Sequence, residues 1–249
     1  MTHRDICVGV LRLIVVMAVG AIGIVGFTSN VTAAGSAAIS TAGAATSSAV
    51  SAVSALDAAS WTDASLGNID PKVFSLALHA AATAVARGDV RSPATLTVID
   101  FSRPSTTRRL WVYDLRSHEL VLEDLVSHGR GSGRTLPTMF SNDPGSNQSS
   151  LGLFRTAEAY VGKNGYSLRL DGLEPAINGR ARERAIVMHG APYVNAATAQ
   201  AQGYLGRSQG CPAVRPEISR ALIDTVKGGG LLFAYYPDSA WLNTSAYLN

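Results

Sequence analysis

Residues 187–215 read VMHGAPYVNAATAQAQGYLGRSQGCPAVR and place a histidine and a cysteine next to glycines. The apolar run 185–188 predicts a short buried strand that ends at His189. Cys211 follows in a second glycine-containing segment. A thiol is a strong nucleophile only as the thiolate, and an imidazole at hydrogen-bond distance accepts its proton. The pattern therefore predicts Cys211 as a nucleophile and His189 as its base.

The residues around this pair suggest supporting roles. Gly190 and Gly210 allow a substrate to approach the backbone closely. We expect the backbone N–H groups of Gly210 and Cys211 to point at a developing oxyanion. Ser208 is expected to orient His189 or the substrate. The alternative is a buried, inert cysteine and an unrelated loop histidine. The position of Cys211 in a glycine-containing loop favours the catalytic interpretation over this alternative.

Two arginines flank the cysteine segment, and an aromatic residue follows the histidine. We expect Arg207 and Arg215 to bind substrate carboxylates or to favour the thiolate; the alternative is that they stabilise the fold or the surface. Tyr193 is expected to line the substrate groove, with core packing as its alternative. His128 is a possible second groove histidine, although a structural role is favoured.

The N-terminal third of the chain has a different composition. Residues 1–33 combine an arginine-bearing start, the apolar run 13–27 and small residues near position 33, which is typical of a secretory signal peptide. An uncleaved anchor remains the alternative. Residues 34–60 consist mainly of Ala, Ser and Thr and predict a linker. Removal of the signal segment leaves Cys211 as the single cysteine of an exported chain.

Overall composition excludes several classes of protein. Two cysteines in 249 residues exclude a disulfide-stabilised miniprotein, and a net charge of +3 is too weak for a dedicated nucleic-acid binder. The sequence contains no HExxH and no CxxC motif, and its histidines and cysteines are too sparse to predict a zinc site.

The remaining residues predict a β-rich α+β fold. A helix is expected over 70–87, where Asp70 and Pro71 form a start signal. A second is expected over 216–227. We assign 61–91 to an N-terminal helical segment, 92–239 to a catalytic domain and 240–249 to a C-terminal tail. His118 is expected in a solvated turn. Strands are expected over 94–100, 109–115, 120–126, 153–159, 166–170, 185–188 and 231–236, with a hairpin turn at 162–165.

The order of HG at 189–190 and SQGC at 208–211 resembles the signature of murein L,D-transpeptidases with the YkuD-type catalytic domain, which is His-Gly, a spacer and Ser-His-Gly-Cys. The similarity is closest to the branch with the motif Gly-Arg-Ser-x-Gly-Cys-Pro-Ala, which matches residues 206–213, and it covers roughly residues 92–238. Gln209 stands where the broader family has a second histidine, and the spacer is longer. Both differences leave the role of base to His189 alone.

The resemblance implies a mixed β-sheet sandwich with an open groove, and a reaction that needs no metal or cofactor. Cys211 would attack a carbonyl of diaminopimelate in a peptidoglycan tetrapeptide and release the terminal D-alanine, forming a thioester. An amine from a second stem peptide would give an L,D cross-link, whereas water would give L,D-carboxypeptidase activity. We expect a monomer in the periplasm or cell envelope, touching the membrane only through an uncleaved N-terminal segment. The alternative function is a non-catalytic module of the same fold that binds the cell wall.

Overall fold

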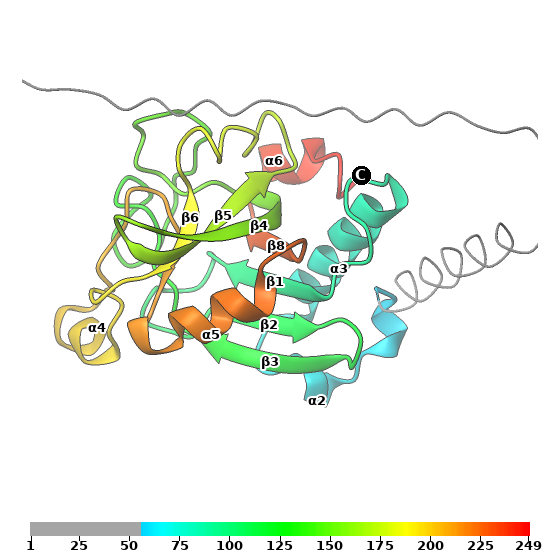
Figure 1. Cartoon of the computed structure of the whole chain (residues 1–249), viewed down its shortest axis with the longest axis horizontal. Helices are drawn as coiled ribbons and strands as arrows, with labels where there is room; N and C mark the ends of the chain where they lie inside the picture. Colours follow the sequence, from blue (N-terminus) through cyan, green and yellow to red (C-terminus); the bar gives the residue numbers. More distant parts are fainter. Residues whose placement is uncertain (1–55) are drawn as a thin grey trace, which may run out of the picture.

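The structure, a computed structural model, describes residues 56–249 (Figure 1). The predicted signal segment, 1–33, and residues 34–55 of the predicted linker lie outside the described residues. Within 56–249, no helix combines the length and the apolar character needed to cross a membrane.

A mixed β-sheet forms the centre of the described region. Its strands are β1 (Thr95–Asp100), β2 (Leu110–Asp114), β3 (Glu119–Asp124), β4 (Gly152–Gly162), β5 (Gly165–Gly172), β6 (Val187–Gly190), β7 (Ala213–Val214) and β8 (Leu231–Tyr235). They form one sheet in the order β3-β2-β1-β8-β4-β5-β6-β7. The β1–β8 and β6–β7 pairs are parallel, and the other neighbouring pairs are antiparallel. This arrangement confirms the predicted β-rich α+β class.

The helices cover the sheet and its ends. They are η1 (Ala58–Ser60, a 3₁₀ turn), α2 (Asp63–Leu66), α3 (Pro71–Ala86), α4 (Ala196–Gln202), α5 (Pro216–Val226) and α6 (Ser239–Thr244). Both α3 and α5 contact β1, and every residue of β1 is buried. In Figure 1, α5 crosses in front of the strands, whereas α3 lies beside β1 and β8.

Local sequence signals explain where these elements begin and end. The carboxylate of Asp70 accepts a hydrogen bond from the Lys72 N–H at 2.8 Å, and Pro71 occupies the first helical position, so α3 starts where the sequence predicts. The predicted hairpin turn is also confirmed, because β4 ends at Gly162 and β5 begins at Gly165. Both strands extend beyond the residues predicted for them.

The N-terminal helical segment contributes to the same core as the strands. Trp61 packs edge-on against Phe74 of α3 and Tyr113 of β2, with ring centroids 5.0 and 5.5 Å apart. His118 also packs edge-on against Trp61, at 5.1 Å, and is half-buried. His118 lies in the predicted turn between β2 and β3, but the expectation that it is solvated is wrong, because Trp61 packs against that turn in the folded chain.

The predicted C-terminal tail also packs against the body of the domain. Trp241 and Tyr247 are buried, and the Trp241 indole Nε1–H donates to the carboxylate of Glu174 at 3.1 Å. The proposed boundaries at residues 91 and 239 stay predictions. Residues on both sides of each boundary share one hydrophobic core.

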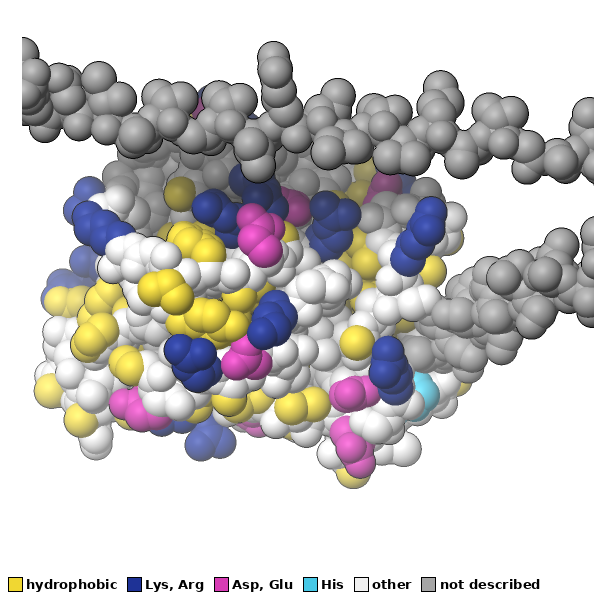
Figure 2. All heavy atoms as spheres, viewed as in Figure 1, with side chains coloured by type: hydrophobic (Ala, Val, Ile, Leu, Met, Phe, Trp, Pro, Cys, Tyr) yellow, Lys and Arg dark blue, Asp and Glu magenta, His cyan; other side chains and the backbone are white. Residues whose placement is uncertain are grey.

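The charge on the surface is mixed. On the face shown in Figure 2, basic and acidic side chains are interspersed with apolar and uncharged ones. This distribution agrees with the small net charge of +3.

The pairing of the short strands at one end of the sheet positions the predicted catalytic residues. His189 of β6 lies opposite Ala213 of β7, which follows Cys211 by two residues. An isolated bridge joins Gly129 to Ser208 and ties the cysteine segment to the loop after β3. Residues far apart in the sequence therefore meet at this end of the sheet.

Candidate active site

A groove of about 940 Å³ opens at this end of the sheet. Its walls come from the loop 141–150, the tip of the β4–β5 hairpin, the end of β6 and the cysteine segment. Cys211 and His189 both line it, as do Gly190, Tyr193 and Arg207. The structure therefore brings most of the predicted site residues to one surface.

Cys211 is largely enclosed by the start of β6 and the residues before it. The residue is 8% exposed. The Val187 N–H points at Sγ at 3.5 Å, and the thiol points at the carbonyl oxygen of Ala185 at 3.6 Å. Burial raises the pKa of the Cys211 thiol above its usual range, while the Val187 N–H and the Arg184 guanidinium oppose that rise. The resting side chain is therefore the neutral thiol at neutral pH.

His189 presents one defined tautomer to the groove. Its Nδ1 lies 3.0 Å from the carbonyl oxygen of Gly190, which requires Nδ1 to carry the proton and leaves Nε2 as an acceptor. Burial lowers the pKa of the imidazole below its ordinary value. Within the described residues, no hydrogen bond joins His189 to Cys211, although both line the same groove.

Ser208 organises the cysteine segment from within. Its Oγ accepts the Gly210 N–H at 3.0 Å and donates to the carbonyl oxygen of Cys211 at 2.7 Å. Ser208 makes no hydrogen bond to His189, because its hydroxyl is used inside its own loop. Its expected role towards the substrate stays a prediction, and Ser208 lines the groove. The Gly210 N–H is likewise engaged, so the Cys211 N–H is the remaining candidate donor to an oxyanion.

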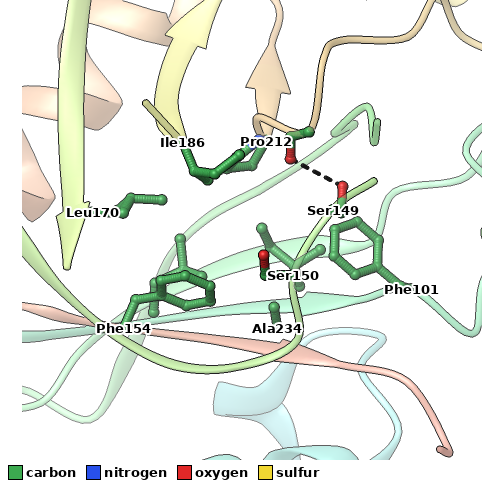
Figure 3. Close-up of a pocket in the computed structure, with 11 residues that line it drawn as sticks. Phe101, Ser149, Ser150, Phe154, Leu170, Ile186, Pro212 and Ala234 are labelled. Carbon is green, nitrogen blue, oxygen red and sulfur yellow. Dashed lines mark hydrogen bonds between the residues drawn. The ribbon is translucent and has the colours of Figure 1, made fainter. Parts of the chain in front are cut away.

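Gly210 is required by its backbone conformation. Its φ is +123°, and a Cβ there would lie 2.8 Å from both the Gln148 carbonyl oxygen and Ile186 Cδ1. Ser149 fixes the carbonyl of Gly210 through a hydrogen bond of 3.1 Å, and it also accepts the Gly129 N–H. Figure 3 shows this bond beside a small apolar cavity of about 10 Å³ beneath the cysteine segment.

Three further predicted residues line the groove. Arg207 donates from Nη1 to the Gly133 carbonyl oxygen at 2.8 Å, and it carries no ion pair within the described region. Tyr193 is partly buried, and this burial raises the pKa of its phenol to about 12. Gly190 allows close packing, because a Cβ there would come 2.7 Å from Ser219 Oγ of α5.

Arg215 has a different environment from Arg207. Its guanidinium donates to both carboxylate oxygens of Asp124, at 2.9 and 2.6 Å, and the Asp124 side chain is only 5% exposed. Arg215 is absent from the groove lining. The predicted substrate contact is therefore corrected to the fold-stabilising alternative, because a buried carboxylate requires a partner.

His128 lies in the interior rather than in the groove. Its Nδ1 accepts a hydrogen bond from Arg109 Nη2 at 2.8 Å, and both side chains are fully buried. Burial, followed by the nearby Arg109 charge, lowers the pKa of His128 to about 3. The favoured structural role thus agrees with its position, and its backbone carbonyl accepts the Ser208 N–H.

Sequence reasoning did not single out Arg184, which also lines the groove beside Cys211. Arg130 and Lys163 were missed as well. The spacing of Arg180, Arg182 and Arg184 was visible in the sequence, but nothing local distinguishes the third from the other two. Within residues 56–249, no group of three or more His, Cys, Asp or Glu side chains is arranged to hold a metal ion.

Comparison with known proteins identifies the family. The family model described as "L,D-transpeptidase catalytic domain" matches residues 66–235. The chain belongs to this family. The search of curated proteins gave no match.

Part of this chain is similar to solved structures of other L,D-transpeptidases. An L,D-transpeptidase from Mycobacterium smegmatis shares 15% identity over 57% of this chain and 59% of its own, with a TM-score of 0.37. L,D-transpeptidase 3 from Mycobacterium tuberculosis, in complex with a faropenem-derived adduct, shares 14% identity over 58% of this chain and 61% of its own, with a TM-score of 0.38. The chain thus spans about three fifths of the length of these structures.

Proposed function

We propose that this protein is an exported cysteine acyl transferase that acts on peptidoglycan stem tetrapeptides. It forms an acyl thioester on Cys211 and then produces L,D cross-links or releases terminal D-alanine. The observation that carries the proposal is the placement of Cys211 and His189 in one groove of a domain that belongs to the L,D-transpeptidase family.

The first half-reaction removes the terminal D-alanine. Cys211 Sγ transfers its proton to His189 Nε2 and attacks the diaminopimelate carbonyl that is bonded to D-alanine. The Cys211 N–H is the candidate donor to the tetrahedral oxyanion. Collapse breaks the C–N bond, and the imidazolium returns the proton to the leaving amine.

The second half-reaction resolves the thioester. An amine of a second stem peptide, or water, loses a proton to His189 and attacks the same carbonyl carbon. The thiolate leaves and regains the proton, which restores both residues. Since Sγ faces Ala185 in the resting structure, proton transfer to His189 requires one of the two side chains to reorient when substrate enters.

The groove carries charge suited to an anionic peptide. Arg130, Lys163, Arg184 and Arg207 line it, whereas Glu183 is the acidic residue among its lining. Guanidinium groups bind carboxylates with paired hydrogen bonds. We therefore assign Arg207, with Tyr193, to the binding of the stem peptide.

Export to the periplasm or cell envelope is part of the proposal. It is supported by residues 1–33, which have the composition of a signal segment, and by a substrate that lies outside the cytoplasm. Detection of the mature N-terminus by mass spectrometry in envelope fractions tests this part. An intact N-terminus in the cytoplasmic fraction would contradict it.

The decisive experiment is product analysis on defined muropeptides. Purified protein is incubated with tetrapeptide muropeptides and compared with Cys211→Ala and the near-isosteric Cys211→Ser. Cross-linked dimers indicate transpeptidation and tripeptides indicate carboxypeptidation, while both variants should give neither. Full turnover by Cys211→Ala would refute the mechanism.

The same preparation tests the alternative of a wall-binding module. Its supporting observation is that Cys211 is buried, at 8% exposed. A carbapenem-like acylating agent should add its mass to the peptide that contains Cys211. A folded wild-type protein that binds muropeptides, forms no adduct and gives no product would favour the module.

A further inference from the structure

Arg184 lies beside the cysteine segment and extends across the loop that supports it. Its Nη2 donates to the Gln148 carbonyl oxygen at 2.7 Å, and its Nη1 donates to Ser150 Oγ at 2.6 Å. A Cβ on Gly210 would lie 3.5 Å from Nη2 and 2.8 Å from the same Gln148 oxygen. The guanidinium is therefore packed against the residue that precedes Cys211.

The positive charge of Arg184 has no carboxylate partner. None of the ion pairs in residues 56–249 includes Arg184, whereas Arg180 pairs with Glu183, and Arg182 pairs with Glu158 and Asp171. The hydrogen-bond acceptors around Arg184 are backbone carbonyls and serine hydroxyls. A half-buried cation bound only to neutral acceptors remains available to an anion that forms beside it.

The thiolate of Cys211 is an anion that forms beside the Arg184 guanidinium during the reaction. The two groups line the same groove, and they interact electrostatically: the Arg184 charge opposes the effect of burial on the pKa of the thiol. The other charged or titratable groups around the groove are His189, Tyr160, Tyr193, Arg207, Arg130, Lys163, Glu183 and the nearby Asp143. Because burial lowers its pKa, the His189 imidazole is neutral at neutral pH and supplies no resting positive charge.

We propose that Arg184 is a positioning residue that stabilises the Cys211 thiolate. When the S–H bond breaks, the proton moves to His189 Nε2 or to water, and Arg184 stays protonated throughout. The guanidinium compensates the charge on sulfur and, through the loop 141–150, keeps the cysteine segment in place. This proposal rests on the nucleophilic role of Cys211.

The test measures the ionisation of the thiol and not turnover. Full-length wild type, Arg184→Gln and Arg184→Lys are alkylated with iodoacetamide between pH 6 and 10.5, and labelling of the peptide that carries Cys211 is followed by mass spectrometry. Arg184→Gln should raise the pH midpoint by roughly one unit, because a neighbouring opposite charge lowers a thiol pKa by about that much. Arg184→Lys should stay close to wild type.

Arg182→Gln is the matched control, since it removes the same charge two residues away but leaves the groove intact. Its midpoint should equal that of wild type. A purely structural role predicts a lower melting temperature for Arg184→Gln with an unchanged midpoint, and that result would overturn the proposal. If Arg184→Gln does not fold, Arg184→Lys provides the test. This variant keeps the positive charge, so an alkylation midpoint raised by about one pH unit would also overturn the proposal.

Because alkylation requires no muropeptide, this result is separate from the proposed function. A shifted midpoint in an inactive protein would support the role of Arg184 and contradict the proposed reaction. Turnover with an unshifted midpoint would support the proposed reaction and contradict the role of Arg184.

Discussion

The backbone N–H of Val187 points at the sulfur of Cys211 across 3.5 Å. Val187 begins β6 and His189 lies two residues further along the same strand. One short strand therefore supplies a donor to the sulfur and the predicted base. The paired β6 and β7 strands hold this relationship, which no local sequence signal specifies.

Gly210→Ala should disrupt the site more than an ordinary glycine substitution. The positive φ of +123° and the short contacts to Gln148 and Ile186 predict a loss of roughly 2–3 kcal/mol in unfolding free energy. Chemical denaturation measures this. Gly203→Ala is the control, since its φ is +78° with open space around it, and it should cost about 1 kcal/mol. Equal losses in the two variants would show that the close contacts do not matter.

Arg215→Ala should destabilise the fold while leaving substrate affinity nearly unchanged. Removal of the guanidinium leaves the buried Asp124 carboxylate uncompensated, and with Arg215 37% exposed we expect a loss of about 2 kcal/mol. Urea denaturation and the KM for tetrapeptide measure the two effects. Asp124→Asn/Arg215→Gln should lose less than the sum of its single changes. A large rise in KM with unchanged stability would instead restore the substrate role of Arg215.

The stability of the folded protein should fall as the pH falls from 8 to 5. Because the pKa of His128 is about 3 in the folded protein and has an ordinary value of 6.5, the unfolded chain binds the proton first. The stabilisation is complete above pH 6.5 and decreases towards pH 3, with a loss of about 2 kcal/mol by pH 5. Urea midpoints at several pH values measure this loss. His189, whose pKa is also lowered, adds to it.

His128→Gln provides the control for this pH dependence. Its stability should be lower overall, because Arg109 loses its imidazole partner, but the decline between pH 8 and 5 should be shallower. An unchanged slope would exclude His128 as its main source.

Trp61→Ala should destabilise the whole domain, although Trp61 lies ahead of the first long helix. The indole contacts Phe74, Tyr113 and His118, and loss of such a buried ring costs about 3–4 kcal/mol. Thermal and urea denaturation measure the change. Val161→Ala is the control, since Val161 is 78% exposed and should change little. A single shared transition at lower stability is expected, whereas loss of α3 alone would contradict a common core.

Local signals in the sequence were sufficient for much of the fold. The start of α3 depends on Asp70, Pro71 and Lys72, which are neighbours, and the β4–β5 turn depends on residues 162–165. Such interactions are short-range, so they are visible in a single sequence. The motif around Cys211 is likewise local, and it indicates the family that the match over residues 66–235 shows.

Long-range partners were not accessible in the same way. Asp124 and Arg215 are 91 residues apart in the chain, and Gln148 and Arg184 are 36 apart. Arg207 and Arg215 look alike in the sequence, yet one lines the groove and the other neutralises a buried carboxylate. Which of them faces the groove depends on how the cysteine segment pairs with β6 and with the loop after β3.

The sequence by itself determined the β-rich class and the family motif with its histidine and cysteine, because these depend on residue type, order and local spacing. Only the tertiary structure decided that the Ser208 N–H bonds to the carbonyl of His128, that His128 is buried against Arg109, and that Arg184 lies beside Cys211. The physical reason is that charge, burial and hydrogen-bond satisfaction depend on which distant segments the folded sheet brings together.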